Sequence, residues 1–229
     1  MKFIVIEGLD GSGKSTQLNM LKNYLNEQNI RFQYLHFPRT DSKIFGDLVA
    51  RFLRGELGEI NHVNPYLIAL IYAGDRNDAK QLIKKWLNEN YLVVVDRYVF
   101  SNIAFQCAKL KSQDEKNKLS EWIKDLEYNY YKIPKPALNI FLNVPFEFTL
   151  QNLTNQRGGS DRDYLKGKED IHEKDIDFQR RVQEVYLYEA QTDNSLKIIN
   201  CTDDKGQMPS SEIVFNKLIT LLKLEKIIS

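Results

Sequence analysis

The chain has 229 residues, of which 42% are hydrophobic and 28% charged, a balance typical of a folded globular protein rather than a disordered one. Lys and Arg number 32 against 31 Asp and Glu, so the net charge of +1 argues against a protein that grips nucleic acid, which usually needs a clustered basic face. Cys107 and Cys201 are too few for a disulfide framework and lack metal-ligand spacing. We expect both to be buried thiols in a reducing compartment.

No targeting or membrane segment stands out. The apolar run Phe3–Ile6 is too short for the core of a signal peptide, and no run approaches the roughly 18 apolar residues of a membrane span. We therefore expect a cytoplasmic protein, with a single domain over residues 1–229.

The N-terminal stretch joins a strand to a phosphate-binding loop. Continuous apolar residues predict a buried strand over Lys2–Glu7, and leucines at helical spacing predict a helix from Thr16 to about Glu27. The sequence between them matches G-x-x-x-x-G-K-[ST] at every specified position, in the context that the motif requires, which disfavours a plain Gly/Ser turn. Lys14 is expected to reach the outer phosphates, and the Ser15 hydroxyl to ligate Mg²⁺. We assign the phosphates of a nucleoside triphosphate to Gly8, Leu9, Asp10, Gly11, Ser12, Gly13, Lys14, Ser15 and Thr16.

The rest of the sequence alternates strands with helices. Strands are predicted over Arg31–His36, Leu92–Asp96, Leu138–Val144 and Leu196–Asn200. Helices are predicted over Ile44–Leu53, Asn64 to about Asn88, Val99–Lys109, Lys116–Tyr131, Pro145–Gln156, Glu173–Gln191 and Ile213–Leu224. Gly74 marks a point where the long helix could be interrupted. Phe178, Val182, Val185 and Leu187 mark the buried side of the helix over Glu173–Gln191.

This alternation predicts an α/β fold, with a five-stranded parallel sheet and helices on both faces. Ligands of such sheets bind at the carboxyl ends of the strands. The phosphate loop, the segment Phe37-Pro38-Arg39 and the segment Asp96-Arg97-Tyr98 are therefore expected to face one crevice. A Gly-rich, charged stretch that begins at Gln156 is interpreted as a mobile loop.

Asp96 and Arg97 form the second candidate site. An acid at the end of a buried strand suits Mg²⁺, and an arginine in a crevice needs an anion for its donors. The alternative is an internal Asp96–Arg97 ion pair at a strand end. His36, His62 and His172 lack the spacing of a metal site or a catalytic triad and are interpreted as structural.

Tyr72 and Arg76 lie four residues apart, on one face of a predicted helix. An aromatic ring followed one turn later by a guanidinium could stack on a nucleobase and hydrogen-bond to its edge. A core tyrosine beside a surface arginine is the alternative, and composition alone does not decide between the two.

These motifs together resemble the thymidylate kinase family. The resemblance rests on the phosphate loop, Phe37-Pro38-Arg39, Tyr72 with Arg76, and Asp96-Arg97-Tyr98 followed by Ser101-Asn102 and Phe105-Gln106. It spans residues 2 to about 181, and residues of about 157–170 look like the lid of that family. Members of the family transfer the γ-phosphoryl group of ATP to dTMP with Mg²⁺, usually as homodimers.

The resemblance implies roles for the matched positions. Asp10 is expected to bind the 3′-hydroxyl of dTMP, Arg39 its phosphate, and Arg97 both that phosphate and the transferring group. Base contacts are implied for Tyr72, Arg76, Asn102 and Gln106, and Phe105 is expected to crowd the 2′ position of the sugar. Ser15 of the loop motif and Asp96 at the strand end remain the candidate metal ligands.

One position departs from part of the family. Some members carry an arginine directly after the acid of the phosphate loop, where this chain has Gly11. We hypothesise that Arg157 or Arg162 of the lid supplies the missing charge, so that the catalytic set is Lys14, Arg97, Arg157 and Arg162. The alternative is that both lid arginines are solvated loop charges.

Two rival functions remain open. A deoxynucleoside kinase shares the fold but needs a carboxylate, commonly at the end of the second strand, to deprotonate a free hydroxyl. The segment His36-Phe37-Pro38-Arg39 offers an arginine there instead, which favours an acceptor that already carries a phosphate. A non-catalytic nucleotide-binding regulator is the other rival. It is disfavoured by the retention of Lys14, Ser15, Asp96, Arg97 and the two lid arginines.

Overall fold

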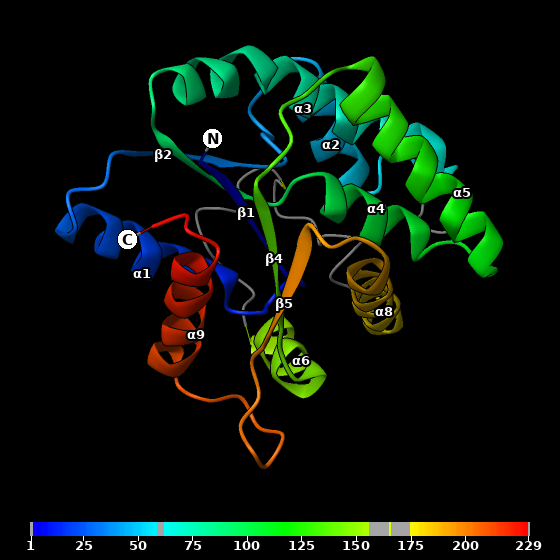
Figure 1. Ribbon diagram of the computed structural model, residues 1–229. Helices are drawn as coiled ribbons and strands as arrows, with labels where there is room; N and C mark the ends of the chain where they lie inside the picture. The colour runs from blue at the N-terminus through cyan, green and yellow to red at the C-terminus, as the bar shows by residue number, and fades with distance from the viewer. Residues whose placement is uncertain (1, 59–61, 156–164, 166–174, 229) are drawn as a thin grey trace.

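A computed structural model describes residues 2–58, 62–155, 165 and 175–228 of the chain. Its centre is one parallel sheet in the order β2-β3-β1-β4-β5 (Figure 1), which confirms the predicted architecture. The strands are β1 (Phe3–Glu7), β2 (Phe32–His36), β3 (Leu92–Asp96), β4 (Leu138–Asn143) and β5 (Leu196–Asn200).

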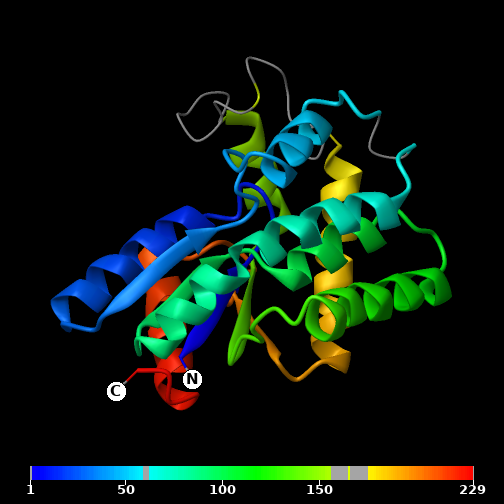
Figure 2. The same cartoon turned by 90° about the horizontal axis from the view of Figure 1, so that it is seen from above.

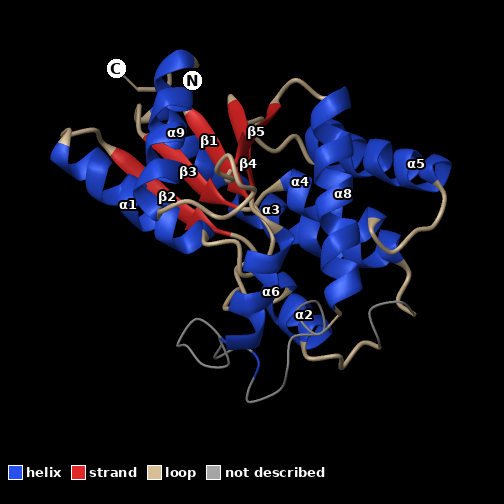
Figure 3. Cartoon of the chain, turned by 90° about the horizontal axis from the view of Figure 1, so that it is seen from below, coloured by secondary structure: helices blue, strands red, loops and turns tan. Residues whose placement is uncertain are grey.

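Helices cover both faces of the sheet (Figure 3). Alternate residues of β1 point to opposite faces, so that Ile4 and Ile6 pack on one side and Phe3 and Val5 on the other. The first side is covered by α1 (Lys14–Glu27) and α9 (Ser211–Leu224). The second side is covered by α3 (Pro65–Asn88), α4 (Val99–Cys107), α5 (Gln113–Lys124) and α8 (Ile176–Thr192). Two further helices are α2 (Phe45–Leu53) and α6 (Phe146–Asn155).

Helix α3 runs without a break, so the suspected interruption at Gly74 is absent. The Asn64 side chain caps its start by accepting a hydrogen bond from the Tyr66 backbone nitrogen at 2.9 Å, with Pro65 at the first position. Gly74 instead makes room for a packing contact, because the ring of Phe45 from α2 lies directly over it. The missing side chain therefore lets α2 approach α3 closely (Figure 2).

We expect Gly74→Ala to destabilise the protein by about 1–3 kcal/mol, because the added methyl would overlap with the edge of the Phe45 ring. For this net loss to appear, the steric cost of the overlap must exceed the gain in helix propensity of about 1 kcal/mol that Ala brings. Urea unfolding is the measurement, with Asp78→Ala, at an exposed position one turn further along α3, as the control. A stability of Gly74→Ala equal to or above the parent would contradict this account of the α2–α3 contact.

The helix predicted over Lys116–Tyr131 differs at both ends. It begins at Gln113, where Ser112 and Glu115 form a capping box, a signal that the apolar pattern did not include. After Lys124 the chain continues as a π-helical turn, Asp125–Tyr130. This turn carries the fully buried Glu127 against Arg76 of α3.

Helix α8 starts at Ile176, with the Asp175 side chain as its cap. Phe178, Val182 and Val185 are buried as predicted, but Leu187 is only partly buried and Tyr186 takes the core position. The i, i+4 spacing from Val182 accounts for this difference.

Both cysteines are free and buried, as expected. Among the described residues, no helix is long and apolar enough to cross a membrane. The lid predicted over residues of about 157–170, with Arg157 and Arg162, lies outside the described residues except for Leu165.

Candidate functional site

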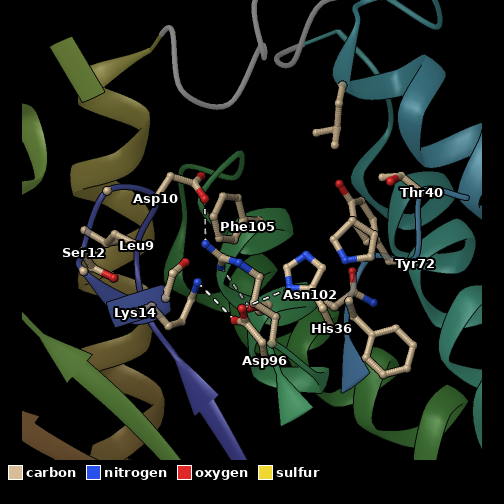
Figure 4. Close-up of a pocket in the computed structure, with 18 of the residues that line it drawn as sticks. Leu9, Asp10, Ser12, Lys14, His36, Thr40, Tyr72, Asp96, Asn102 and Phe105 are labelled. Carbon is tan, nitrogen blue, oxygen red and sulfur yellow. Dashed lines mark hydrogen bonds and ion pairs between the residues drawn. The ribbon is translucent and has the colours of Figure 1, made fainter. Parts of the chain in front are cut away.

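A cavity of about 640 Å³ opens where β1, β2 and β3 end, as the rule for parallel sheets predicts. Figure 4 shows Asp10 and Lys14 of the phosphate loop on one wall and Thr40 and Tyr72 on the opposite wall. The cavity wall includes every substrate residue predicted from the sequence except Arg39: Asp10, Tyr72, Arg76, Arg97, Asn102, Phe105 and Gln106. Its volume is in the ordinary range for small-molecule sites.

The phosphate loop lies between β1 and α1, as its motif requires. All of its residues from Leu9 to Thr16 line the cavity, and α1 begins directly after Gly13. The free backbone N–H groups at the start of α1 and its dipole favour an anion here. Buried Lys14 adds a full positive charge at the same point.

Lys14 forms an ion pair with Asp96, whose Oδ1 lies 3.1 Å from Lys14 Nζ. The other oxygen of Asp96, Oδ2, lies 3.0 Å from His36 Nδ1, and Tyr34 donates a long hydrogen bond to it at 3.5 Å. Burial alone would raise the pKa of Asp96, but the charge of Lys14 and the contact with His36 hold it well below its usual range. Asp96 is therefore a fixed anion at the strand end.

Arg97 follows Asp96 in a left-handed backbone conformation, with φ of 64°. Such a conformation costs a non-glycine residue on the order of 1 kcal/mol and often marks a functional site. It directs Arg97 Nη2 to Asp10 Oδ1 at 2.7 Å and Nη1 to the Ser101 hydroxyl at 3.2 Å. Burial would lower the pKa of Arg97, but nearby acids, chiefly Asp10, raise it above its ordinary value.

The alternative interpretation, an ion pair between Asp96 and Arg97, is therefore wrong, because each of the two residues pairs with a different partner. Asp96 pairs with Lys14 at 3.1 Å, and Arg97 pairs with Asp10 at 2.7 Å. Asp10 also accepts a hydrogen bond from Gln179 Nε2 at 3.0 Å, which joins the loop to α8. These contacts link the phosphate loop to the carboxyl end of β3 and to α8.

Glu7, the last residue of β1, is a buried acid that the sequence analysis treated only as part of a strand. Its carboxylate accepts hydrogen bonds from the Tyr98 backbone nitrogen, the Ser101 hydroxyl and the Tyr186 hydroxyl. Burial raises its pKa, although these hydrogen bonds and the charge of Arg97 work in the opposite direction. Glu7 thus fixes the Ser101 hydroxyl that contacts Arg97.

Tyr72 and Arg76 occupy one end of the cavity. Tyr72 is partly exposed in the cavity wall, whereas Arg76 is only 2% exposed, so the alternative of a core tyrosine beside a surface arginine is wrong. Arg76 Nε and Nη2 form a two-pronged ion pair with Glu127, at 2.5 and 2.7 Å. Asn102 Nδ2 donates to the same carboxylate at 3.1 Å.

Phe105 and Gln106 complete this end of the site from α4. The Phe105 ring packs edge-on against Phe178 and under the Arg97 guanidinium, which lies 5.1 Å from the ring centroid. Gln106 Oε1 accepts a hydrogen bond from Lys109 Nζ at 2.7 Å. Burial lowers the pKa of Lys109 to about 7.

Arg39 is placed differently from the other predicted substrate residues. Its backbone nitrogen, Nε and Nη2 all donate to Asp75, at 2.8 to 2.9 Å, and it does not line the cavity. Nη1 takes no part in these contacts. Asp75 directly precedes Arg76 on α3, so one segment of this helix both holds Arg39 and contributes a residue to the cavity wall.

Gly11, the position that carries arginine in some family members, has little room for a side chain here. Its φ of 73° is left-handed, and an added Cβ would lie 3.1 Å from the Thr149 carbonyl oxygen and 3.2 Å from Asn152 Cβ of α6. Asn152 Nδ2 also donates to the Gly11 carbonyl oxygen at 2.7 Å. Helix α6 therefore packs where that side chain would begin.

Several residues that line the cavity were not predicted as site residues from the sequence. His36, interpreted as structural, lines the cavity beside Asp96, and Thr40 and Leu53 line it as well. The position of His36 at the carboxyl end of a strand could have indicated this. Glu127 could not have been found this way, because it is distant in the sequence from every motif.

Comparison with known proteins gives the family. The family model described as thymidylate kinase matches residues 6–211. The chain belongs to the thymidylate kinase family. A thymidylate kinase of Mycobacterium tuberculosis is 31% identical over 80% of this chain and 83% of its own length. That of Plasmodium falciparum is 32% identical over 86% of this chain and 81% of its own.

The match also holds over nearly the full length and in three dimensions. A probable thymidylate kinase of Thermococcus kodakarensis is 30% identical over 96% of this chain and 97% of its own. The solved thymidylate kinase of Candida albicans superimposes with a TM-score of 0.71, covering 99% of this chain and 92% of that one. At 23% identity, that structure supports the thymidylate kinase fold alone.

Proposed function

We propose that this thymidylate kinase family member transfers the γ-phosphoryl group of ATP to dTMP, giving dTDP and ADP. The observation that supports this most is the meeting of two half-sites in one cavity. The phosphate loop with Lys14 provides a triphosphate site, and Tyr72, Arg76 and Asn102 provide a base site opposite it. Arg97 lies between them.

In this proposal catalysis is positioning and charge stabilisation, as in other phosphoryl transfers. Residues Gly8 to Thr16 hold the phosphates of ATP, and Lys14 neutralises charge on the outer phosphates. Arg97 binds the acceptor phosphate and the transferring group. Asp10 accepts a hydrogen bond from the sugar hydroxyl while it orients Arg97, and Phe105 packs against the sugar.

Arg39 is retained as a ligand of the acceptor phosphate. Its Nη1 is the guanidinium nitrogen that Asp75 does not use, so it could bind a phosphate while the ion pair persists. Asp75 would then act as the anchor that orients the remaining donor.

Mg²⁺ is proposed as the metal, with Ser15 and Asp96 as its protein ligands. A hydroxyl and a carboxylate suit Mg²⁺, which is usually held by one or two protein groups together with substrate phosphates and water. When bound, it would neutralise charge on the phosphates. Within the described residues, no three acids, histidines or cysteines gather as a metal cluster, so the phosphates would have to complete the site.

We also propose a single domain over residues 1–229, a cytoplasmic location and a homodimer. Leu67 and Leu70 of α3 are 59% and 39% exposed, and an apolar stripe of this kind suits a contact between two copies.

The decisive assay follows ADP release with ATP·Mg²⁺ and dTMP, dUMP, UMP, dCMP or thymidine as acceptor. We expect dTMP to be preferred, with a modest margin over dUMP, because one methyl group in an apolar pocket is worth about 1–3 kcal/mol. Faster turnover of thymidine would favour a deoxynucleoside kinase. Turnover of no acceptor would favour a nucleotide-binding regulator.

The lid arginines give a separate prediction. If Arg157 or Arg162 supplies the charge that Gly11 lacks, replacing that residue with Ala should lower kcat by at least about 10³-fold, the lower bound for such arginines elsewhere. Each variant is assayed at saturating ATP and dTMP. A loss below about tenfold for both would leave them as solvated loop charges.

A further inference from the structure

Glu127 is a fully buried carboxylate beside the base end of the cavity. Its Oε2 accepts from Arg76 Nε at 2.5 Å, and its Oε1 accepts from Arg76 Nη2 at 2.7 Å and Asn102 Nδ2 at 3.1 Å. Both partners line the cavity, whereas Glu127 does not. A buried charge of this kind is expensive unless it is paired, so the three residues form one unit.

This unit fixes which way round the Asn102 amide lies. One Nδ2 hydrogen goes to the Ala69 carbonyl oxygen at 3.0 Å and the other to Glu127. A reversed amide would place Oδ1 against that carbonyl oxygen and against the carboxylate. Asn102 therefore keeps only Oδ1 for a ligand, and in the described part of the chain this buried oxygen has no hydrogen-bond partner. A buried acceptor without a partner favours a ligand that brings an N–H group.

Residues with donors neighbour Asn102 on two sides, since Arg76 shares Glu127 with it and Gln106 lies one turn further along α4. Glu127 uses Nε and Nη2 of Arg76, which leaves Nη1 as the guanidinium nitrogen outside the ion pair. Gln106 has its Oε1 bound to Lys109, which leaves its Nε2 hydrogens for the cavity that it lines. The wall thus presents donor, acceptor and donor groups.

A thymine or uracil ring presents the complementary order along its edge: the O4 acceptor, the N3–H donor and the O2 acceptor. Cytosine has an amino donor at position 4 and an acceptor at N3, so it would face like groups at two of the three positions. We propose that Glu127 is a positioning residue that sets the hydrogen-bonding polarity of this site, so that it selects the monophosphate of a 4-keto pyrimidine over that of cytosine. This inference rests on the proposed function.

The test is Glu127→Gln, which keeps the shape of the side chain but turns one acceptor into a donor. In place of Oε1 the new NH₂ group meets donors of both Arg76 and Asn102, so the Asn102 amide loses one of the two acceptors that fix its orientation. In place of Oε2 it meets Arg76 Nε, which disturbs the guanidinium. We expect the KM for dTMP to rise at least about tenfold while kcat stays within about threefold, because a base contact is lost and the transferring group is untouched. The ratio of kcat/KM for dTMP over dCMP should fall at least about tenfold.

Glu189→Gln is the matched control. Glu189 is a buried carboxylate paired with Lys124 and Ser120, away from the cavity, so the same change there should leave the dTMP/dCMP ratio unaltered. If Glu127 had a merely structural role, Glu127→Gln would lower kcat/KM for dTMP and for dCMP by the same factor. The dTMP/dCMP ratio would then equal that of the parent enzyme, and this result would overturn the inference.

Glu127→Asp keeps the negatively charged carboxylate, and so its hydrogen-bond acceptors, but on a side chain that is shorter by one methylene group. We expect it to retain the preference for dTMP over dCMP while the KM for dTMP rises about fivefold, since polarity is kept and positioning is loosened. If Glu127→Gln does not fold, an unchanged KM in Glu127→Asp still contradicts the inference. Failure of the parent enzyme to turn over dTMP would instead overturn the proposed function, so the two outcomes are distinguishable.

Discussion

Lys14→Met is expected to lower kcat/KM at least about a hundredfold, the usual cost of removing one charge that stabilises the transition state. Met preserves the length and the apolar stem of the side chain, so the change removes little besides the ammonium group. That group is buried at the start of α1, where the loop N–H groups already favour an anion. Its loss leaves charge on the outer phosphates without its nearest cation.

The same substitution has a second effect, on Asp96. Lys14 is the largest influence that lowers the pKa of this buried carboxylate, so its removal leaves Asp96 with His36, Tyr34 and the weaker influence of the Arg97 charge. The pKa of Asp96 should then rise toward its usual value or above, because burial works in that direction. Lys14→Met should therefore be less stable than the parent, and assays must be run well below its Tm.

Lys22→Met is the control for Lys14→Met. Lys22 lies on the same helix, with its ammonium 3.5 Å from the centroid of the Tyr34 ring and outside the cavity. It should keep the activity of the parent. A folded Lys14→Met variant within tenfold of the parent in kcat/KM would remove Lys14 from the catalytic set.

The sequence predicted the parts of the site that follow from local rules. The phosphate loop follows β1 and Asp96 ends β3. Because parallel strands have their carboxyl ends at the same edge of the sheet, the two lie close together. Tyr72 and Arg76 lie on one face of α3 because of helical spacing. Each of these predictions depends on residues close together in the chain.

The partners of these residues could not be predicted in the same way. Arg76 is held by Glu127, 51 positions away, and the π-helical turn that carries Glu127 leaves no mark in the hydrophobic pattern. Arg39 is held by Asp75, 36 positions away, which explains why it does not line the cavity. Buried ion pairs form wherever packing brings charges together, and a single sequence does not record that packing.

Arg97→Lys is expected to lower kcat at least about a hundredfold, even though the charge is kept, because a lysine cannot reproduce the fork of the guanidinium. Arg97 uses Nη2 on Asp10 and Nη1 on Ser101, and both contacts fix its plane. A flexible ammonium would satisfy one of these partners at a time and would lose the orientation that an in-line transfer needs. Arg97→Ala should cost more, since the positive charge at this point is then lost together with the fork of donors.

The left-handed backbone at position 97 affects the Arg97→Lys and Arg97→Ala variants equally. Lys and Ala bear the same strain at φ of 64°, so a difference between the two variants reports on the side chain rather than on the turn. Arg31→Ala is the control, because Arg31 is exposed at the opposite end of β2 from the cavity and should leave kcat unchanged. The measurement is kcat at saturating ATP and dTMP, with Tm recorded for each variant. If Arg97→Lys kept the kcat of the parent, Arg97 would supply only a diffuse charge, and its contacts with Asp10 and Ser101 would serve the fold rather than the reaction.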